Sequence, residues 1–387
     1  MKKRIINTFN LPVLSAILIL ATGHPHAIAQ ELVIPQRWNH CTYDVPALYG
    51  RDTVTLCFIG DVMMHASQIA HALKDDGSYG FGNCFSLIRN DLTEADLAIA
   101  NMEFPLGGEP HTGYPAFSAP DEIALQMAEE GIDIFLAANN HIFDKGRTGA
   151  ERTLAVYRSL YQTYGIRFTG AASDNNEKAG NHPLTMIRNG IRISFINATY
   201  GTNGGHRTGW PSVNYLSDME SLKEAFRTAG NSDVIIALPH WGEEYVLRHS
   251  EDQEEMALWM AGMGADAIIG THPHVIQDTT MINGTHVAYS LGNAISNMSA
   301  TNTQMELMLE LNVIREEDGD ITLETPELTF LWCSRPGGFC NDYIVIPVKE
   351  YIGKRDKWHD PSDYDKMTAT LKRVMKATGI EKNTCNE

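Results

Sequence analysis

The sequence has few basic residues, few cysteines and no long apolar run after residue 20. It contains 30 Lys and Arg against 48 Asp and Glu, which gives a net charge of −18 with histidine neutral. A surface this acidic repels nucleic acid unless a local basic patch or a metal ion intervenes, so we expect no nucleic-acid partner. Because no later segment is apolar and long enough to cross a membrane, we expect no spanning helix in the mature chain.

The six cysteines show neither a CxxC pair nor the Cys–His spacing of a zinc site, which favours a structural role over chemistry. In an exported chain such residues can form disulfides. Cys333 and Cys340 flank a short loop that a bridge could close. Cys41 and Cys385 lie near the two ends of the chain and could tie them together.

The N-terminus has the pattern of a secretion signal. Residues 2–4 are basic, Leu11–Leu20 is apolar, and Ala27–Ala29 is a small-x-small cleavage site. No cysteine lies near the cut, which argues against a lipid anchor there. Removing residues 1–29 takes away three basic and no acidic groups, so the net charge becomes −21. We therefore expect a soluble protein that is periplasmic or secreted after cleavage.

Short apolar runs alternate with amphipathic segments from residue 53 to about residue 290. The runs predict buried strands at Val54–Ile59, Leu97–Ala100, Ile132–Ala137, Ile191–Ile196, Val234–Leu238, Ala267–Ile269 and Val287–Leu291. Helices that each end at a glycine are predicted between them, over residues 120–131, 148–164 and 251–263. This alternation predicts βαβ units and a largely parallel sheet.

The C-terminal part follows a different pattern. Met305–Ile314 alternates apolar and polar residues, Glu317–Asp320 is a turn, and Ile321–Leu331 returns, so we expect an antiparallel hairpin. We expect this hairpin to complete a second sheet packed on the first. Ser362–Gly379 predicts a closing helix with its apolar face inward.

The sequence shows no internal repeat and no low-complexity linker, which favours one continuous domain. We expect four parts, which are a cleaved signal (1–29), an N-terminal extension (30–52), a catalytic domain (53–350) and a C-terminal helical tail (351–387).

Polar residues that commonly bind metals follow several of the expected strands. They are Asp61, Glu103, Asn140, His240, His272 and His274. His272 and His274 are two apart on an extended segment, so their side chains point to the same side. Because open α/β sheets bind ligands at the carboxyl ends of their strands, we expect these side chains to converge. The set suits a first-row metal, and with a bridging carboxylate it can hold two ions about 3.5–4 Å apart.

Each of these residues also has a plainer interpretation when it is taken alone. Asp61 could cap a helix, Glu103 could be a surface charge and Asn140 could serve a turn. The histidines could be surface residues or hydrogen-bonded core residues. The metal site is favoured because so many such residues follow strands together.

Six motifs stand in the order and spacing of one known family. They are Gly60–Met64, Asn101–Pro105, Asn139–His141 with Asp144 and Gly146, His240–Tyr245, Gly270–Gln277 and Tyr289–Asn293. Over about residues 53–295 the chain resembles the CapA-type proteins of poly-γ-glutamate capsule biosynthesis, a branch of the calcineurin-like metallophosphoesterases. Residues 200–204 are similar to the glycine-rich loop of that branch. The resemblance implies an α/β (α+β) fold, a four-layer αββα sandwich of two mixed sheets with metals at the strand tips.

The resemblance also implies roles for individual residues. The six residues named above would hold one or two divalent ions of Mn, Fe or Zn. His141 lies where the superfamily keeps a general acid for the leaving group, and Asp144 would orient it through the other ring nitrogen. A metal-bound hydroxide would be the nucleophile, because coordination lowers the pKa of water towards neutrality. Further candidates for substrate contact are Asn101, Arg147, Asn203, Arg207, Glu243 and Asn293, and a solvated surface role is an equal alternative for the two arginines.

One position departs from the superfamily pattern, which opens with Asp-x-His. Met63 stands at the third position, and its thioether is a poor ligand for the expected metals. His65 could supply the missing ligand, or it could simply begin a helix over Ala66–Leu73.

Three functions fit these features. The first is a metal-dependent hydrolase acting on a phosphoester or another envelope-derived ester, and the second is the same site cutting γ-glutamyl amide bonds of a polymer. The third is a non-catalytic metal-binding protein that guides poly-γ-glutamate or another envelope polymer during export. Each would use an anionic small molecule or polymer, and capsule synthesis or export proteins are candidate partners.

The charge and the expected proton donor favour hydrolysis over guiding. A net charge of −21 repels a polyanion unless divalent cations bridge the two. His141 with Asp144 also favours catalysis, because a scaffold has no need of a proton donor beside a metal ligand.

Overall fold

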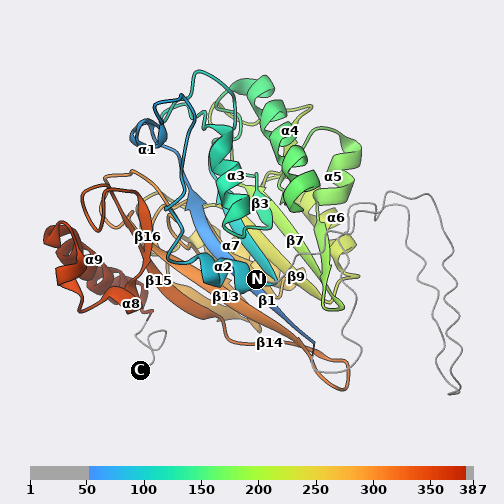
Figure 1. Cartoon of the computed structure of the whole chain (residues 1–387). Helices are drawn as coiled ribbons and strands as arrows, with labels where there is room; N and C mark the ends of the chain where they lie inside the picture. The colour runs from blue at the N-terminus through green and yellow to red at the C-terminus, as the bar shows by residue number, and fades with distance from the viewer. Residues whose placement is uncertain (1–51, 381–387) are drawn as a thin grey trace, which may run out of the picture.

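The computed structural model describes residues 52–380. The predicted signal, Cys41 and Cys385 lie outside the described residues. Two sheets pack face to face, and helices cover the outer face of each (Figure 1). This arrangement confirms the expected αββα sandwich of two mixed sheets. No helix within residues 52–380 is both long and apolar enough to span a membrane.

The first sheet has the order β16-β15-β13-β1-β2-β3-β4, with β14 paired to β13. Its strands are β1 (Asp52–Val62), β2 (Leu97–Met102), β3 (Ile134–Leu136), β4 (Arg167–Thr169), β13 (Met305–Arg315), β14 (Ile321–Leu323), β15 (Glu327–Ser334) and β16 (Ile344–Pro347). Strands β1 to β4 pair parallel with one another, whereas β13 pairs antiparallel with β1 and β13 to β16 pair antiparallel with one another.

The second sheet has the order β11-β12-β10-β9-β7-β6. Its strands are β6 (Leu184–Arg188), β7 (Ile191–Thr199), β9 (Val234–His240), β10 (Ala267–Ile269), β11 (Thr279–Ile282) and β12 (Thr285–Ala288). The two-residue strands β5 (Ala171–Ala172) and β8 (Ser212–Val213) pair apart from both sheets. The run predicted as a strand at Val287–Leu291 forms β12, which begins and ends earlier than expected.

The helices are α1 (Ala66–Ala72), α2 (Arg89–Glu94), α3 (Asp121–Glu129), α4 (Gly146–Tyr164), α5 (Asn175–Asn181), α6 (Met219–Ala229), α7 (Glu251–Gly262), α8 (Val348–Tyr351), the 3₁₀ turn η2 (Arg355–Lys357) and α9 (Pro361–Thr378). Helices α3, α4, α7 and α9 lie where the sequence predicts them, α1 lies over the possible helix after His65, and α2, α5, α6, α8 and η2 were not predicted. Gly165 ends α4 and Gly379 ends α9, each in the left-handed conformation that glycine adopts without a Cβ clash. Ser250 and Gln253 form a capping box that begins α7.

The hydrophobic core has three layers, and β1 contributes to two of them. Leu56 and Phe58 pack between the sheets, while Cys57 and Ile59 face the layer under α3 and α4. Successive strand residues point to opposite faces, so a strand buried on both sides reads as one unbroken apolar run. The third layer lies between the second sheet and the helices α6 and α7.

The C-terminal hairpin does not complete a second sheet, so that prediction is wrong. Strand β13 pairs antiparallel with β1, from Asp52↔Arg315 to Phe58↔Leu309, and therefore extends the first sheet. Leu307 packs between the sheets and Met308 packs on the outer side, so β13 fits a central position buried on both faces. The second sheet is instead formed by the later part of the strand–helix alternation.

The disulfide predicted between Cys333 and Cys340 is also wrong, because both thiols are free. The Sγ of Cys333 is buried at the end of β15 and lies 3.6 Å from the carbonyl oxygen of Ser296, and burial raises its pKa to about 11. The Sγ of Cys340 instead lies 3.8 Å from the carbonyl oxygen of Asp342. The two sulfurs therefore have different neighbours.

Candidate metal centre

The six predicted metal ligands meet at the end of the sandwich where parallel strands of both sheets finish. Asp61 lies near the end of β1, Glu103 directly follows β2, and His240 is the last residue of β9. Asn140 follows β3, and His272 and His274 follow β10. All six residues are buried. The convergence expected from the strand order is thus present in the structure.

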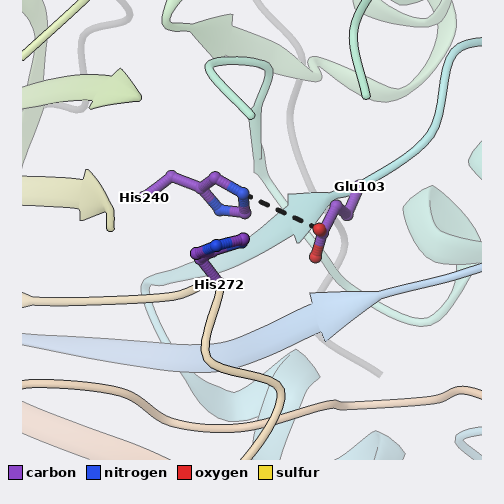
Figure 2. Close-up of side chains that lie close together, drawn as sticks. All are labelled: Glu103, His240 and His272. Atoms are coloured by element: carbon purple, nitrogen blue, oxygen red, sulfur yellow. Dashed lines mark ion pairs between the residues drawn. The ribbon is translucent and has the colours of Figure 1, made fainter. Parts of the chain in front are cut away.

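Glu103 lies at the centre of this cluster. Its Oε1 atom is 3.7 Å from Nε2 of His240, 3.8 Å from Nε2 of His274 and 4.0 Å from Nε2 of His141. Figure 2 shows Glu103 facing His240 and His272 across one small space. Burial, reinforced by the negative charge of Asp61, raises the pKa of Glu103 well above its usual range.

Neither carboxyl oxygen of Glu103 has a hydrogen-bond partner among the described residues. A buried carboxylate without a donor is costly unless it is protonated or a cation binds it. The two carboxyl oxygens without a hydrogen-bond donor therefore indicate a cation-binding role. In this respect the buried residues fit a metal centre.

Asp61 is held in place by two donors. Nδ2 of Asn101 donates to Oδ1 of Asp61 at 2.6 Å, and the backbone N–H of His272 donates to Oδ2 at 3.0 Å. His272 and His274 have φ angles of +100° and +58°. Such left-handed backbone costs about 1–3 kcal/mol in a residue other than glycine, and it persists where the surroundings enforce it. On this backbone the imidazole of His274 lies 3.6 Å from Oδ2 of Asp61 and 3.8 Å from Oε1 of Glu103.

The imidazoles of His240 and His272 are held in the neutral form that binds metal. Burial, with repulsion from His272, lowers the pKa of His240 well below its usual value. Burial also lowers the pKa of His272 to about 3. Neutral rings offer a lone pair to a cation. Nδ1 of His272 has no hydrogen-bond partner in the described part of the chain.

Hydrogen bonds orient the imidazoles of His240 and His274. Nε2 of His240 lies 2.9 Å from Oδ1 of Asn140, and its Nδ1 lies 3.0 Å from Oγ1 of Thr271. Nδ1 of His274 lies 3.0 Å from Oδ1 of Asn293. Partners of this kind fix the ring orientation and the tautomer of a ligating histidine.

Three sets of ligand atoms lie within 4.8 Å of one another. They are Glu103–His240–His272, Asp61–Glu103–His274 and Glu244–His272–His274. Glu103 belongs to the first two sets, so its carboxylate is shared by two groups of candidate ligands. Nitrogen and carboxylate donors of this kind suit divalent first-row metals, so the residues present fit the expected ions.

A second cluster adjoins the ligands at His141. Nδ1 of His141 lies 2.7 Å from Oδ2 of Asp144, which leaves Nε2 facing Glu103. Nδ2 of Asn203 donates to Oδ1 of Asp144 at 3.3 Å and lies 3.0 Å from the ring nitrogen. The Phe117 ring packs against the imidazole in a T-shaped arrangement, with ring centroids 4.7 Å apart. His141 is therefore oriented from three sides.

The remaining predicted contact residues have different surroundings. Asn101 and Asn293 are buried. Nδ2 of Asn101 donates to Asp61, and Oδ1 of Asn293 lies at hydrogen-bond distance from His274. Arg147 donates to the carbonyl oxygens of Trp210 and Thr208. Arg207 lies over the ring of Phe143, with its guanidinium carbon 5.4 Å from the centroid. The structure thus places both arginines near the loop that carries Asn203, outside the ligand cluster.

Sequence reasoning did not single out two residues that lie beside the histidines, Glu244 and Tyr200. The carboxylate of Glu244, rather than that of Glu243, lies among the histidines. The ring centroids of Tyr200 and His272 lie 4.5 Å apart. Both residues belong to recognisable motifs, but adjacent glutamates are equivalent in the linear order.

The structure also settles where Met63 and His65 lie. Met63 is buried in the apolar layer on the outer side of the first sheet. His65 begins α1, where it forms a capping box with Gln68. Within residues 52–380, His65 belongs to no set of candidate His, Cys, Asp and Glu ligands. Of the two possibilities for His65, the helix start is the correct one.

A family comparison agrees with the motifs. The sequence model described as "Bacterial capsule synthesis protein PGA_cap" matches residues 55–298, well over half of the chain, and the chain belongs to this family. It is 27% identical over 321 residues to "Capsule biosynthesis protein CapA" of Bacillus anthracis, which covers 78% of this chain and 71% of that protein. It is 25% identical over 282 residues to "PGA biosynthesis protein CapA" of Bacillus subtilis (strain 168), covering 70% of each.

Solved structures show a more distant similarity. NAD nucleotidase (NadN) of Haemophilus influenzae is 12% identical with a TM-score of 0.44, covering 85% of this chain and 61% of that one. The 5'-nucleotidase precursor of Thermus thermophilus is 14% identical with a TM-score of 0.43, covering 84% of this chain and 59% of that one. Similarity at this level says nothing about the activity of the present chain.

Proposed function

We propose that the protein is an exported metal-dependent hydrolase of capsule biosynthesis that cuts an anionic envelope substrate. The bond is a phosphoester or a γ-glutamyl linkage of a polymer. The observation that supports this most strongly is the His141–Asp144 pair, 2.7 Å apart, with its free ring nitrogen facing the orphaned carboxylate of Glu103. A proton donor beside a cation site is the minimal machinery for assisted hydrolysis.

The ligand cluster would hold one or two ions of Mn, Fe or Zn through Asp61, Glu103, Asn140, His240, His272 and His274. When bound, such ions polarise the scissile group and lower the pKa of water. Asn101 and Asn293 would position Asp61 and His274, because each amide bonds one of these side chains directly.

His141 would act on the leaving group. With the Nδ1 proton donated to Asp144, Nε2 is the atom that can deliver a proton to the departing oxygen or nitrogen. Asp144 would stabilise the charged imidazole, and Asn203 would hold the carboxylate in place. A protein that only guides a polymer has no use for this arrangement, so we favour hydrolysis over the guiding role.

The proposal is tested by measuring metal content and hydrolysis in the same preparations. We expect one or two equivalents of a first-row metal and activity on a phosphodiester, a phosphomonoester or a γ-glutamyl peptide. We expect His141→Ala to lower that activity about tenfold or more while the metal content stays unchanged. His71→Ala is the matched control, because His71 pairs with Asp342 outside the ligand cluster.

Elemental analysis that finds no metal after reconstitution with Mn, Fe or Zn would refute the proposed cofactor. Equal rates for the wild-type protein and His141→Ala would refute the proposed acid.

A further inference from the structure

The third set of candidate ligands differs from the other two in its exposure. Glu103 and Asp61 are fully buried, whereas the side chain of Glu244 is exposed to solvent. Glu244 nevertheless places a carboxyl oxygen within 4.8 Å of ligand nitrogens of His272 and His274, which are buried. One carboxylate of the cluster is thus accessible to an ion that arrives from solution.

The loop that carries Glu244 is held against the histidines by its backbone. The N–H of Tyr245 donates to the carbonyl oxygen of Pro273, the residue between the two histidines, at 2.8 Å. Tyr245 has a φ of +68° and Gly242 a φ of +91°. A Cβ on Gly242 would lie 2.7 Å from the side chain of Gln253, so this close approach requires glycine. The position of Glu244 is therefore built into the loop.

The three sets overlap in a way that connects solvent to the buried carboxylates. His272 belongs both to the exposed set and to the set with Glu103 and His240. His274 belongs both to the exposed set and to the set with Asp61 and Glu103. An ion that leaves Glu244 for either buried position can therefore keep one imidazole throughout. Nδ1 of His272, buried and without a partner among the described residues, is consistent with such a free donor.

We propose that Glu244 is a metal-loading ligand: it binds an incoming divalent cation together with His272 and His274 and passes it to the buried Glu103. This inference rests on the metal centre of the proposed function. It assigns to Glu244 a role in the rate of metal uptake and leaves the resident ligands unchanged. The neighbouring Glu243, equally charged and exposed but absent from the ligand sets found in residues 52–380, has no such role.

The test follows uptake of Co²⁺ by the metal-free full-length protein, using the visible absorption of bound cobalt in a stopped-flow instrument. We expect Glu244→Gln to load about tenfold more slowly than the wild-type protein, since a correctly placed carboxylate both attracts and binds the ion. Glu243→Gln removes the same charge from the same loop, and we expect it to load at the wild-type rate. All three proteins should reach the same final cobalt content by elemental analysis.

Three results would overturn the inference. Equal loading rates for Glu244→Gln and Glu243→Gln would show that only the overall charge matters. A lower final cobalt content in Glu244→Gln would make Glu244 a resident ligand. No cobalt uptake by the wild-type protein would remove both this inference and the proposed cofactor, whereas normal uptake without hydrolysis would refute the proposed activity alone.

Discussion

At the scale of single residues, the proposed chemistry depends on how His141 is held. One oxygen of Asp144 accepts from the ring at 2.7 Å and from the backbone N–H of Phe117 at 2.9 Å. The backbone bond fixes the carboxylate, and the carboxylate fixes the ring. This chain of contacts leaves Nε2 in a defined direction, towards Glu103.

We expect Asp144→Asn to lower kcat about tenfold, and no more than His141→Ala does, while KM and metal content change little. An asparagine amide retains hydrogen-bonding groups but cannot stabilise a charged imidazole. The measurement is steady-state hydrolysis of whichever substrate the panel identifies, together with elemental analysis. Asp342→Asn is the control, because Asp342 and His71 form a comparable pair 3.1 Å apart outside the ligand cluster. A loss of metal in Asp144→Asn would instead point to a structural role.

At the scale of elements, α9 closes one end of the core between the sheets. It lies beside β15 and β16 in Figure 1. Met367, Leu371 and Val374 belong to the same apolar cluster as Trp332 of β15. These residues are spaced three and four apart, so they form one stripe on the helix. The helix therefore belongs to the packing of the first sheet.

We expect Met367→Ala to lower the free energy of unfolding by about 2–5 kcal/mol, because a fully buried side chain leaves a cavity that neighbours fill only in part. Lys372→Ala, on the exposed side of the same helix, should change it by less than about 0.5 kcal/mol. Urea denaturation followed by circular dichroism gives both values. Similar small effects for the two variants would mean that α9 contributes little to the core.

At the scale of the whole molecule, buried neutral histidines link stability to pH. Burial lowers the pKa of His182 to about 3, and that of His65 to about 4. In the unfolded chain a histidine binds a proton below about pH 6.5. The unfolded state therefore binds more protons than the folded state between these values, and stability falls as the pH decreases through this window.

We expect the metal-free protein to lose stability between about pH 6.5 and pH 5, with His182 contributing about 1.4 kcal/mol per pH unit once well below its unfolded pKa. Buried carboxyl groups with raised pKa values, such as Glu103 and Glu306, act in the opposite direction. The comparison with His182→Gln isolates the histidine, and its stability should vary less steeply with pH. Equal slopes in urea titrations at several pH values would exclude this contribution.

Local patterns in the sequence were enough to predict much of the fold. A strand such as β1 reads as an unbroken apolar run because both its faces are buried, and α4 ends at Gly165 because glycine tolerates the left-handed turn. The polar residues that follow the strands were also visible, because so many metal-binding residue types follow apolar runs in one chain. These signals depend on residues that are close together in the sequence, so they can be recognised without the structure.

Pairing between distant segments could not be predicted in this way. The alternation of apolar and polar residues in β13 is compatible with a place in either sheet. Only its pairing with β1 shows that it joins the first sheet. The sulfur atoms of Cys333 and Cys340 are close in sequence, but packing directs each to a different carbonyl oxygen.

The amino-acid sequence alone determined many of the strands and helices, because their periodicity is local. The order of six motifs between residues 60 and 293 determined the family and, through that resemblance, the layered architecture. The sequence also showed the polar side chains that follow the strands. The tertiary structure alone decided which of two adjacent glutamates faces His272 and His274, and that His65 begins a helix. It also decided that Glu103 is buried without a hydrogen-bond donor among the described residues. These outcomes depend on distances and burial between segments far apart in the chain, which only the folded backbone sets.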